Sequence, residues 1–187
     1  MSFQSVEKRV CLQWTLRIFL TVACVAMLAF IFSNSLKTGE QSAAQSSTMV
    51  DVVQNVASVV APNSSIATAT GAAYERLHAW VRMVAHFAEF ALFGALLVWC
   101  VVSYTWRREG LYLALFGVCF VPIVDEFLQV FVADRGAEFC DVCIDVAGGI
   151  CGTLFAIVVL IAIVCIQGSR RAKKERQTAV AVGAVES

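Results

Sequence analysis

The stretch PIVDEFLQVFVADRGAEFCDVCIDVAGGICG, residues 122–152, puts carboxylates and an amide at the ends of two strongly apolar segments. These polar side chains are Asp125, Glu126, Gln129, Asp141 and Asp145. Ionisable groups at membrane depth cost a few kcal/mol each, so they face a bundle interior or a wet cavity and have partners. We therefore expect the two segments to be membrane helices whose polar side chains meet inside a bundle.

A third apolar segment, MVAHFAEFALFG, supplies partners for these side chains. Residues three, four and seven apart share one face of a helix, so Arg82, His86 and Glu89 form a single stripe. The acidic stripe of the last segment continues into Gly148 and Gly152, a spacing of small residues that lets helices approach closely. The sequence therefore predicts that three segments meet to form one polar site.

The composition indicates an integral membrane protein. Of the 187 residues, 59% are hydrophobic and only 15% are charged, and the mean hydropathy is +0.77. Soluble globular proteins are roughly half apolar and about a quarter charged. The formal net charge is zero, and the basic residues gather beside apolar segments, which favours topology signals over a nucleic-acid binding surface.

Four segments are long and apolar enough to cross a membrane, which takes about 20 residues. They cover residues 11–32, 84–106, 111–132 and 142–166. Cytoplasmic segments carry an excess of Lys and Arg, so we expect the N-terminus (1–10), the Arg107–Arg108 turn and the basic tail (167–187) to be cytoplasmic. The loop 33–83 and the loop between the third and fourth spans then face outward, and the polar residues collect on the outer side of the membrane.

The long outward loop contains a further helix. Residues 49–60, MVDVVQNVASVV, are apolar on nearly every side, which suits a short helix lying in the interface or against the bundle. The Ser- and Gln-rich part before it is expected to be flexible or partly helical, and the tail after Gly168 to be disordered. Residues 11–166 thus form one domain, an all-α membrane protein with four transmembrane helices and a short outward-facing amphipathic helix.

The eight cysteines do not suggest a disulfide framework, because most of them lie inside apolar runs, where cysteine behaves as a small hydrophobe. Only Cys140 and Cys143, a CxxC near the start of the last span, have a spacing suited to redox or metal chemistry. In a chain this rich in cysteine a chance CxxC is the simpler interpretation, and whether the two are paired stays open.

The candidate binding residues are Arg82, His86, Glu89, Asp125, Glu126, Gln129, Arg135, Asp141 and Asp145. A purely structural explanation pairs Arg82 with Glu89 and Arg135 with Asp141 to hold helices together. Several carboxylates, one histidine and two arginines at one depth exceed what such pairing needs, so we interpret the cluster as functional. Which of the two neighbouring acidic residues in the third span faces the site stays open.

These motifs resemble the VanZ-like family of small bacterial membrane proteins, which includes a teicoplanin-resistance protein. The resemblance covers about residues 10–166 and rests on FSNS at the end of the first span, HFAEF (86–90), DEFLQVFVADRG (125–136) and the acidic and glycine stripe of the last span. The chain departs from relatives at Asp145, where Asn is frequent, and at Ala133–Asp134, where Pro-Gly is common. These departures concern local charge and loop shape.

The resemblance implies a bacterial plasma-membrane protein that lowers susceptibility to glycopeptides, especially lipid-tailed teicoplanin, and it brings no settled biochemical activity. We expect a non-enzymatic envelope protein whose outer-leaflet site binds an amphiphile, such as a lipid-tailed glycopeptide or a lipid-linked cell-wall intermediate. Its partner is then a membrane lipid or amphiphile and not nucleic acid, a homo-oligomer is compatible with the pattern, and no organic cofactor is expected.

The alternative is an enzyme that acts on a lipid headgroup or a lipid-linked cell-wall intermediate. Glu89, Glu126 or Asp145 would serve as acid or base, with His86 relaying protons or joining carboxylates around a divalent cation. The sequence contains no nucleophile motif or phosphate loop that favours this reading. A proton-relay transporter is less consistent with the pattern, because a through-path needs polar groups in the inner half of the membrane as well.

Overall fold

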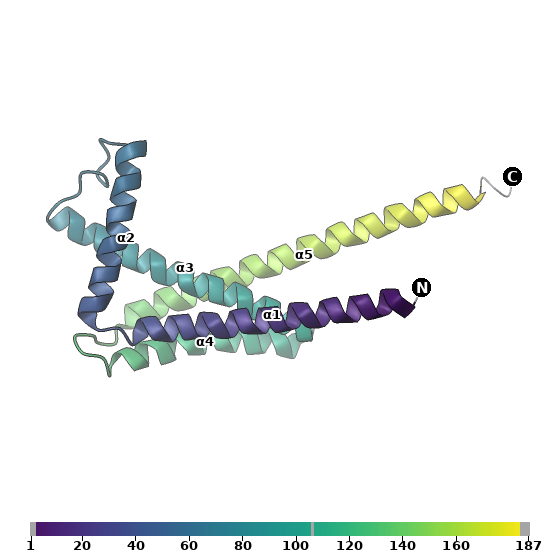
Figure 1. Ribbon diagram of the computed structural model, residues 1–187, viewed down its shortest axis with the longest axis horizontal. Coiled ribbons are helices and arrows are strands. Elements are labelled where there is room, and N and C mark those ends of the chain that lie inside the picture. Colours follow the sequence, from purple (N-terminus) through teal and green to yellow (C-terminus); the bar gives the residue numbers. More distant parts are fainter. Residues whose placement is uncertain (1–2, 106, 184–187) are drawn as a thin grey trace.

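The computed structural model describes residues 3–105 and 107–183, and in these residues the chain forms five helices and no strand. The helices are α1 (Phe3–Ser35), α2 (Gly39–Val60), α3 (Ala72–Tyr104), α4 (Arg108–Gln129) and α5 (Phe139–Gly183). Figure 1 shows α1, α3, α4 and α5 running lengthwise and α2 crossing one end of this bundle. The expected all-α fold with four long helices and one additional helix is confirmed.

Four helices have the length and composition of membrane spans. Their apolar parts are Val10–Ser35, Ala72–Tyr104, Arg108–Gln129 and Phe139–Lys173, with mean hydropathy between 1.9 and 2.9. Large apolar side chains stay exposed along them, as with Phe19, Phe116 and Phe155. A helix that is apolar on all sides belongs in a core or a membrane, so the chain is a multi-pass membrane protein.

The closest helix contact joins α3 to α5, which cross one another (Figure 1). A Cβ atom on Gly148 would overlap the carbonyl of Phe87, and one on Gly152 would overlap the carbonyl of Ala91. Only glycine therefore permits this approach, as the spacing of small residues predicts. The crossing fixes the start of α5 against the first half of α3.

The helix α1 packs along the other side of α3. Its buried Cys24 and Ile31 form an apolar cluster with Phe90 and Phe93 of α3. These contacts hold the end of α1 near Ser35 beside the polar part of α3. The packing matters for the site because α1 ends where α5 begins.

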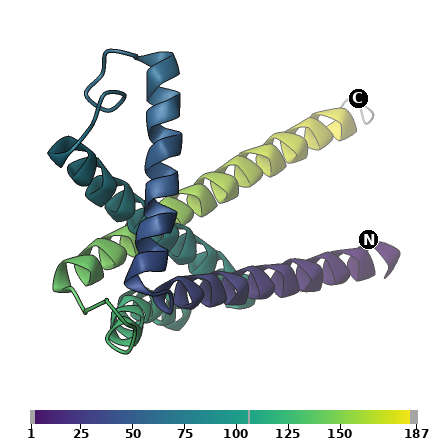
Figure 2. The same cartoon turned by 60° about the vertical axis from the view of Figure 1, so that its left-hand side comes forward.

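The helix α2 is longer than expected from residues 49–60, because it begins at Gly39. The Thr38 side chain accepts from the Gln41 backbone, and the Gln41 side chain accepts from the Thr38 backbone, which forms a complete capping box. The Gly39 N–H donates to the Ala133 carbonyl at 3.2 Å, tying α2 to the α4–α5 loop. Figure 2 shows α2 standing across the bundle end, where valines such as Val56 and Val59 remain exposed.

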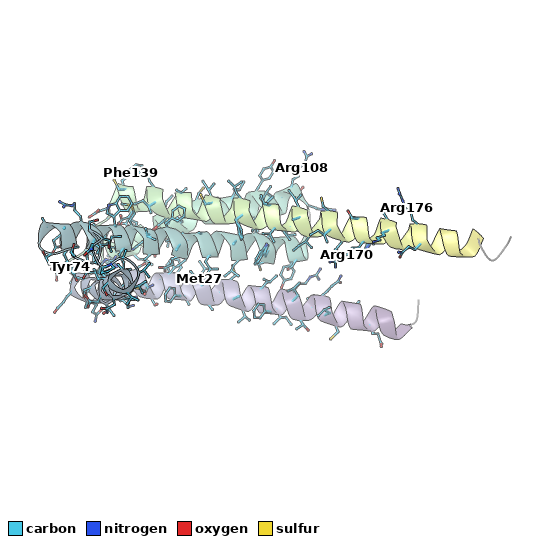
Figure 3. All side chains as sticks on the ribbon, turned by 90° about the horizontal axis from the view of Figure 1, so that it is seen from above. Met27, Tyr74, Arg108, Phe139, Arg170 and Arg176 are labelled. Atoms are coloured by element: carbon cyan, nitrogen blue, oxygen red, sulfur yellow. The ribbon has the colours of Figure 1, made fainter. Side chains whose placement is uncertain are left out.

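The tail was expected to be disordered after Gly168, but α5 continues as one helix to Gly183. Its sequence RRAKKERQTAVAV consists largely of strong helix formers, which explains the continuation. Figure 3 shows this part of α5, with Arg170 and Arg176, projecting beyond Arg108, the first residue of α4. Residues 184–187 of the same expectation lie outside the described residues.

Candidate functional site

The polar side chains gather at one end of the bundle. At this end α1 and α4 end, α5 begins and α2 crosses (Figure 1). Contacts described below bring together all nine candidate residues, from α3, α4, the α4–α5 loop and α5. The helical stripes identified in the sequence thus converge, as the spacing predicted.

Two contacts join the polar stripe of α3 to that of α5. Arg82 Nη2 lies 2.6 Å from Asp141 Oδ2 in an ion pair, and Asp141 sits in the first turn of α5, where the helix dipole favours a carboxylate. One turn deeper, His86 Nδ1 lies 3.3 Å from Asp145 Oδ1. The two stripes therefore face one another across the α3–α5 crossing.

The third span contributes two buried carboxylates with different roles. Asp125 accepts one hydrogen bond from the Ser35 hydroxyl and another from Gln129 Nε2 at 3.2 Å. Glu126 accepts from the backbone N–H of Glu138 at 2.5 Å and so holds the α4–α5 loop. Asp125 therefore faces the pocket described below, while Glu126 fixes the loop beside it.

The end of α1 supplies residues that the candidate list did not contain. Asn34 Nδ2 donates to Glu89 Oε1 at 3.3 Å, and Ser35 meets Asp125. Lys37 Nζ donates both to Asn34 Oδ1 at 2.8 Å and to Gln45 Oε1 of α2 at 2.7 Å. The FSNS motif could have identified these residues, because polar side chains at the end of an apolar span need partners at that depth.

Arg135 of the α4–α5 loop binds the end of α1 instead of a carboxylate. Its Nη1 donates to the carbonyls of Asn34 at 3.2 Å and Ser35 at 3.3 Å, which lie in the last turn of α1, where carbonyls have no partner within the helix. Burial lowers the pKa of Arg135, and the positive charge of Arg82 lowers it further. The alternative pairings Arg82–Glu89 and Arg135–Asp141 are wrong, because the ion pair that forms runs between helices, from Arg82 to Asp141.

These contacts surround a pocket of about 80 Å³. Arg82, His86 and Glu89 line it from α3, Asp125 and Gln129 from α4, and Asn34 and Ser35 from α1. Side chains of α2 that include Ser42, Gln45 and Met49 close it from above. A second pocket, of about 240 Å³, lies beside it under the first turns of α2 and shares Arg82, Gln129 and Arg135 as walls.

Several buried polar atoms at this site have no hydrogen bond. They are His86 Nδ1, both oxygens of Asp145 and Glu126 Oε2. The His86–Asp145 approach falls within ion-pair distance, but it lacks the angles of a hydrogen bond. Since buried polar groups are nearly always paired, His86 and Asp145 are the part of the site where hydrogen-bonding capacity is left unused.

Metal and thiol chemistry gain no support from the geometry. Within residues 3–105 and 107–183, no three His, Cys, Asp or Glu side chains are arranged to hold a metal ion. Cys140 and Cys143 are free thiols on the exposed surface of α5.

Fold and site together define a class, the multi-pass α-helical membrane proteins with a buried polar site at one end of the bundle. A family model described as VanZ/LLP1 matches residues 19–162, most of the chain and every residue of this site. The chain belongs to the VanZ-like family. No curated protein and no solved structure is significantly similar to it.

Proposed function

We propose that this protein binds the polar part of a membrane amphiphile in the pocket between α1, α3 and α4. The observation that supports this proposal is a pocket with charges of both signs at one end of a membrane bundle, lined on one side by α2. An amphiphile suits this position, because its polar part enters the pocket while its apolar part stays in the surrounding lipid.

The pocket walls indicate what such a headgroup carries. Arg82 and Arg135 offer guanidinium donors for phosphate or carboxylate oxygens, which arginine binds with favourable geometry. Glu89 and Asp125 offer acceptors for ammonium, amide or hydroxyl groups. A headgroup with mixed polar groups, such as that of a lipid-tailed glycopeptide or a lipid-linked cell-wall intermediate, matches both kinds of wall.

The family and the charge pattern suggest the biological setting. Lys and Arg favour the cytoplasmic side, and Arg108 and Arg170 lie at the end opposite the pocket (Figure 3). The pocket then opens near the outer leaflet of a bacterial plasma membrane. Binding there lowers susceptibility to glycopeptides and to teicoplanin above all, since its lipid tail brings it to the same leaflet.

The test is drug susceptibility in a sensitive Gram-positive host that expresses matched membrane levels of the variants. Wild type is expected to protect against teicoplanin more than against vancomycin. Glu89→Gln and Arg82→Gln remove charges from the pocket wall and should abolish protection. Glu40→Gln removes an exposed charge from the nearby first turn of α2 and should retain protection.

The outcomes separate the parts of the proposal. Full protection by Glu89→Gln and Arg82→Gln would show that the pocket does not carry the function. No protection by wild type would refute the glycopeptide setting, and binding of lipid-linked wall intermediates to the purified protein would then test the pocket itself. Loss in Glu40→Gln as well would point to the charge of the whole surface and not to the pocket.

One observation supports an enzyme as the second candidate. His86 lines the pocket, and the fully buried Asp145 carboxylate lies 3.3 Å from its Nδ1, close enough to assist a histidine that moves protons. Incubation with labelled membrane lipids would reveal a converted product lost in His86→Ala. Tight binding of an unchanged lipid by both wild type and His86→Gln would favour the binding protein.

A further inference from the structure

An apolar groove lies at the end of the bundle opposite the polar pocket. It measures about 370 Å³ and forms where α5 diverges from α3 and from the start of α4 (Figures 1 and 2). Its walls come from three helices and are mostly apolar. They comprise Val98, Val102, Thr105, Arg107, Arg108, Leu111, Ile157, Leu160, Ile161, Val164 and Cys165.

The groove is divided into an apolar length and a cationic mouth. Val98 of α3 lies at its buried end, and Leu160 and Val164 of α5 line the wall. Arg107 and Arg108 line it at the α3–α4 turn, and both are exposed. This distribution matches a lipid, with an acyl chain along the groove and an anionic headgroup at the mouth.

Backbone contacts of Arg107 and Gly110 place the cationic mouth beside the apolar walls. The Arg107 N–H donates to the Thr105 hydroxyl at 3.2 Å, and the Gly110 N–H donates to the Arg107 carbonyl at 3.1 Å. A Cβ at Gly110 would lie 2.8 Å from Val101 and 2.9 Å from Thr105, so glycine lets α4 start close against α3. The backbone of Arg107 is thereby held at the groove.

The mouth of the groove is positively charged. In the part of the chain that the structure describes, neither Arg107 nor Arg108 makes an ion pair, and Glu109 of the same turn does not line the groove. A second copy of this chain is a poor occupant, because this end also carries Arg170 and Arg171 and two copies would repel. An anionic lipid supplies a negative charge for the two arginines and an acyl chain for the apolar walls.

We propose that this groove binds an anionic phospholipid, with one acyl chain between α3 and α5 and the phosphate against Arg107 and Arg108. The site is separate from the polar pocket, and its existence does not depend on the amphiphile proposed above. It secures the divergent part of α5, where the helix has left its contact with α3.

Native mass spectrometry of the full-length protein, titrated with phosphatidylglycerol or phosphatidylcholine, tests the proposal. Wild type should retain one phosphatidylglycerol about tenfold more tightly than phosphatidylcholine. Arg107→Gln with Arg108→Gln should remove this preference. The matched control, Arg170→Gln with Arg171→Gln, loses the same charge outside the groove and should keep it.

A third variant tests the groove without touching the arginines. Val164→Trp fills the groove from α5 and should weaken phosphatidylglycerol binding about tenfold while both guanidiniums remain. Wild-type binding by Val164→Trp, or an unchanged preference in the Arg107/Arg108 variant, would overturn the proposal. So would an equal loss in the Arg170/Arg171 control, which would reveal a diffuse basic surface.

Discussion

Asp145 is the residue whose placement most constrains the site, because it has no exposed surface and neither carboxylate oxygen accepts a hydrogen bond. Its one ionisable neighbour within ion-pair distance, in the described residues, is His86 at 3.3 Å. A buried carboxylate left without its partner is costly. The two residues should therefore be strongly coupled in stability.

We expect His86→Ala to lower the free energy of unfolding by about 2 kcal/mol, since it strands the Asp145 carboxylate. Adding Asp145→Asn to this variant should restore part of that loss, because the amide keeps the shape and carries no charge. Thermal denaturation of the purified protein in detergent, over the full double-mutant cycle, measures the coupling.

The second histidine provides the control. His78 lies near α2, where its Nε2 is 3.3 Å from the Ala43 carbonyl, and it contacts no carboxylate of the cluster. His78→Ala should show no coupling to Asp145→Asn. If the effects of His86→Ala and Asp145→Asn were simply additive, the pair would not be the unit that the geometry suggests.

The sequence predicted which residues belong to the polar cluster better than it predicted which of them pair with one another. Periodicity placed Arg82, His86 and Glu89 on one face, and all three line the pocket. It could not tell that Arg82 pairs with Asp141, because a spacing rule describes one helix and the distances between helices depend on how they cross. Asn34 and Ser35 were missed as site residues since their role comes from where α1 ends.

Among the elements, the α3–α5 crossing carries the site, because Arg82–Asp141 and His86–Asp145 both span it. We expect Gly152→Ala to destabilise the protein by about 1–3 kcal/mol, since the added methyl group would overlap the Ala91 carbonyl. A lowered midpoint of thermal denaturation in detergent, together with loss of ligand binding, would show that the crossing positions the site.

The same helix offers a matched control for this change. Gly168 is exposed, and nothing lies within 4 Å of a Cβ built there. Gly168→Ala should leave stability unchanged or raise it by up to about 1 kcal/mol, because alanine has the higher helix propensity. Equal destabilisation by both substitutions would mean that close packing at Gly152 is not what matters.

The elements were predictable where one strong pattern acted alone. The four apolar segments became α1, α3, α4 and α5, because nothing competes with the burial of about 20 apolar residues in a membrane. The start of α2 depended on a local capping box at Thr38 within a polar stretch, and the tail of α5 on propensity without burial. The pattern of apolar residues reports neither a capping box nor helix propensity.

For the whole molecule, the arrangement of the helices fixes which charges share one end. Arg108, at the start of α4, lies opposite the polar pocket, at the end toward which the basic part of α5 projects (Figure 3). An even number of spans places both termini on the same side, and the excess of Lys and Arg leads us to expect that side in the cytoplasm. The pocket should then open to the outside.

Cysteine labelling of intact cells tests this orientation with residues that the chain already supplies. In a variant with Cys140 as its sole cysteine, a membrane-impermeant maleimide should label the exposed thiol at the start of α5 without permeabilisation. In a cysteine-free background, Ser169→Cys lies on the exposed far part of α5 and should react only after the membrane is opened. The reverse pattern would place the pocket in the cytoplasmic leaflet, where a drug arriving from outside could not reach it, and the glycopeptide setting would fall with it.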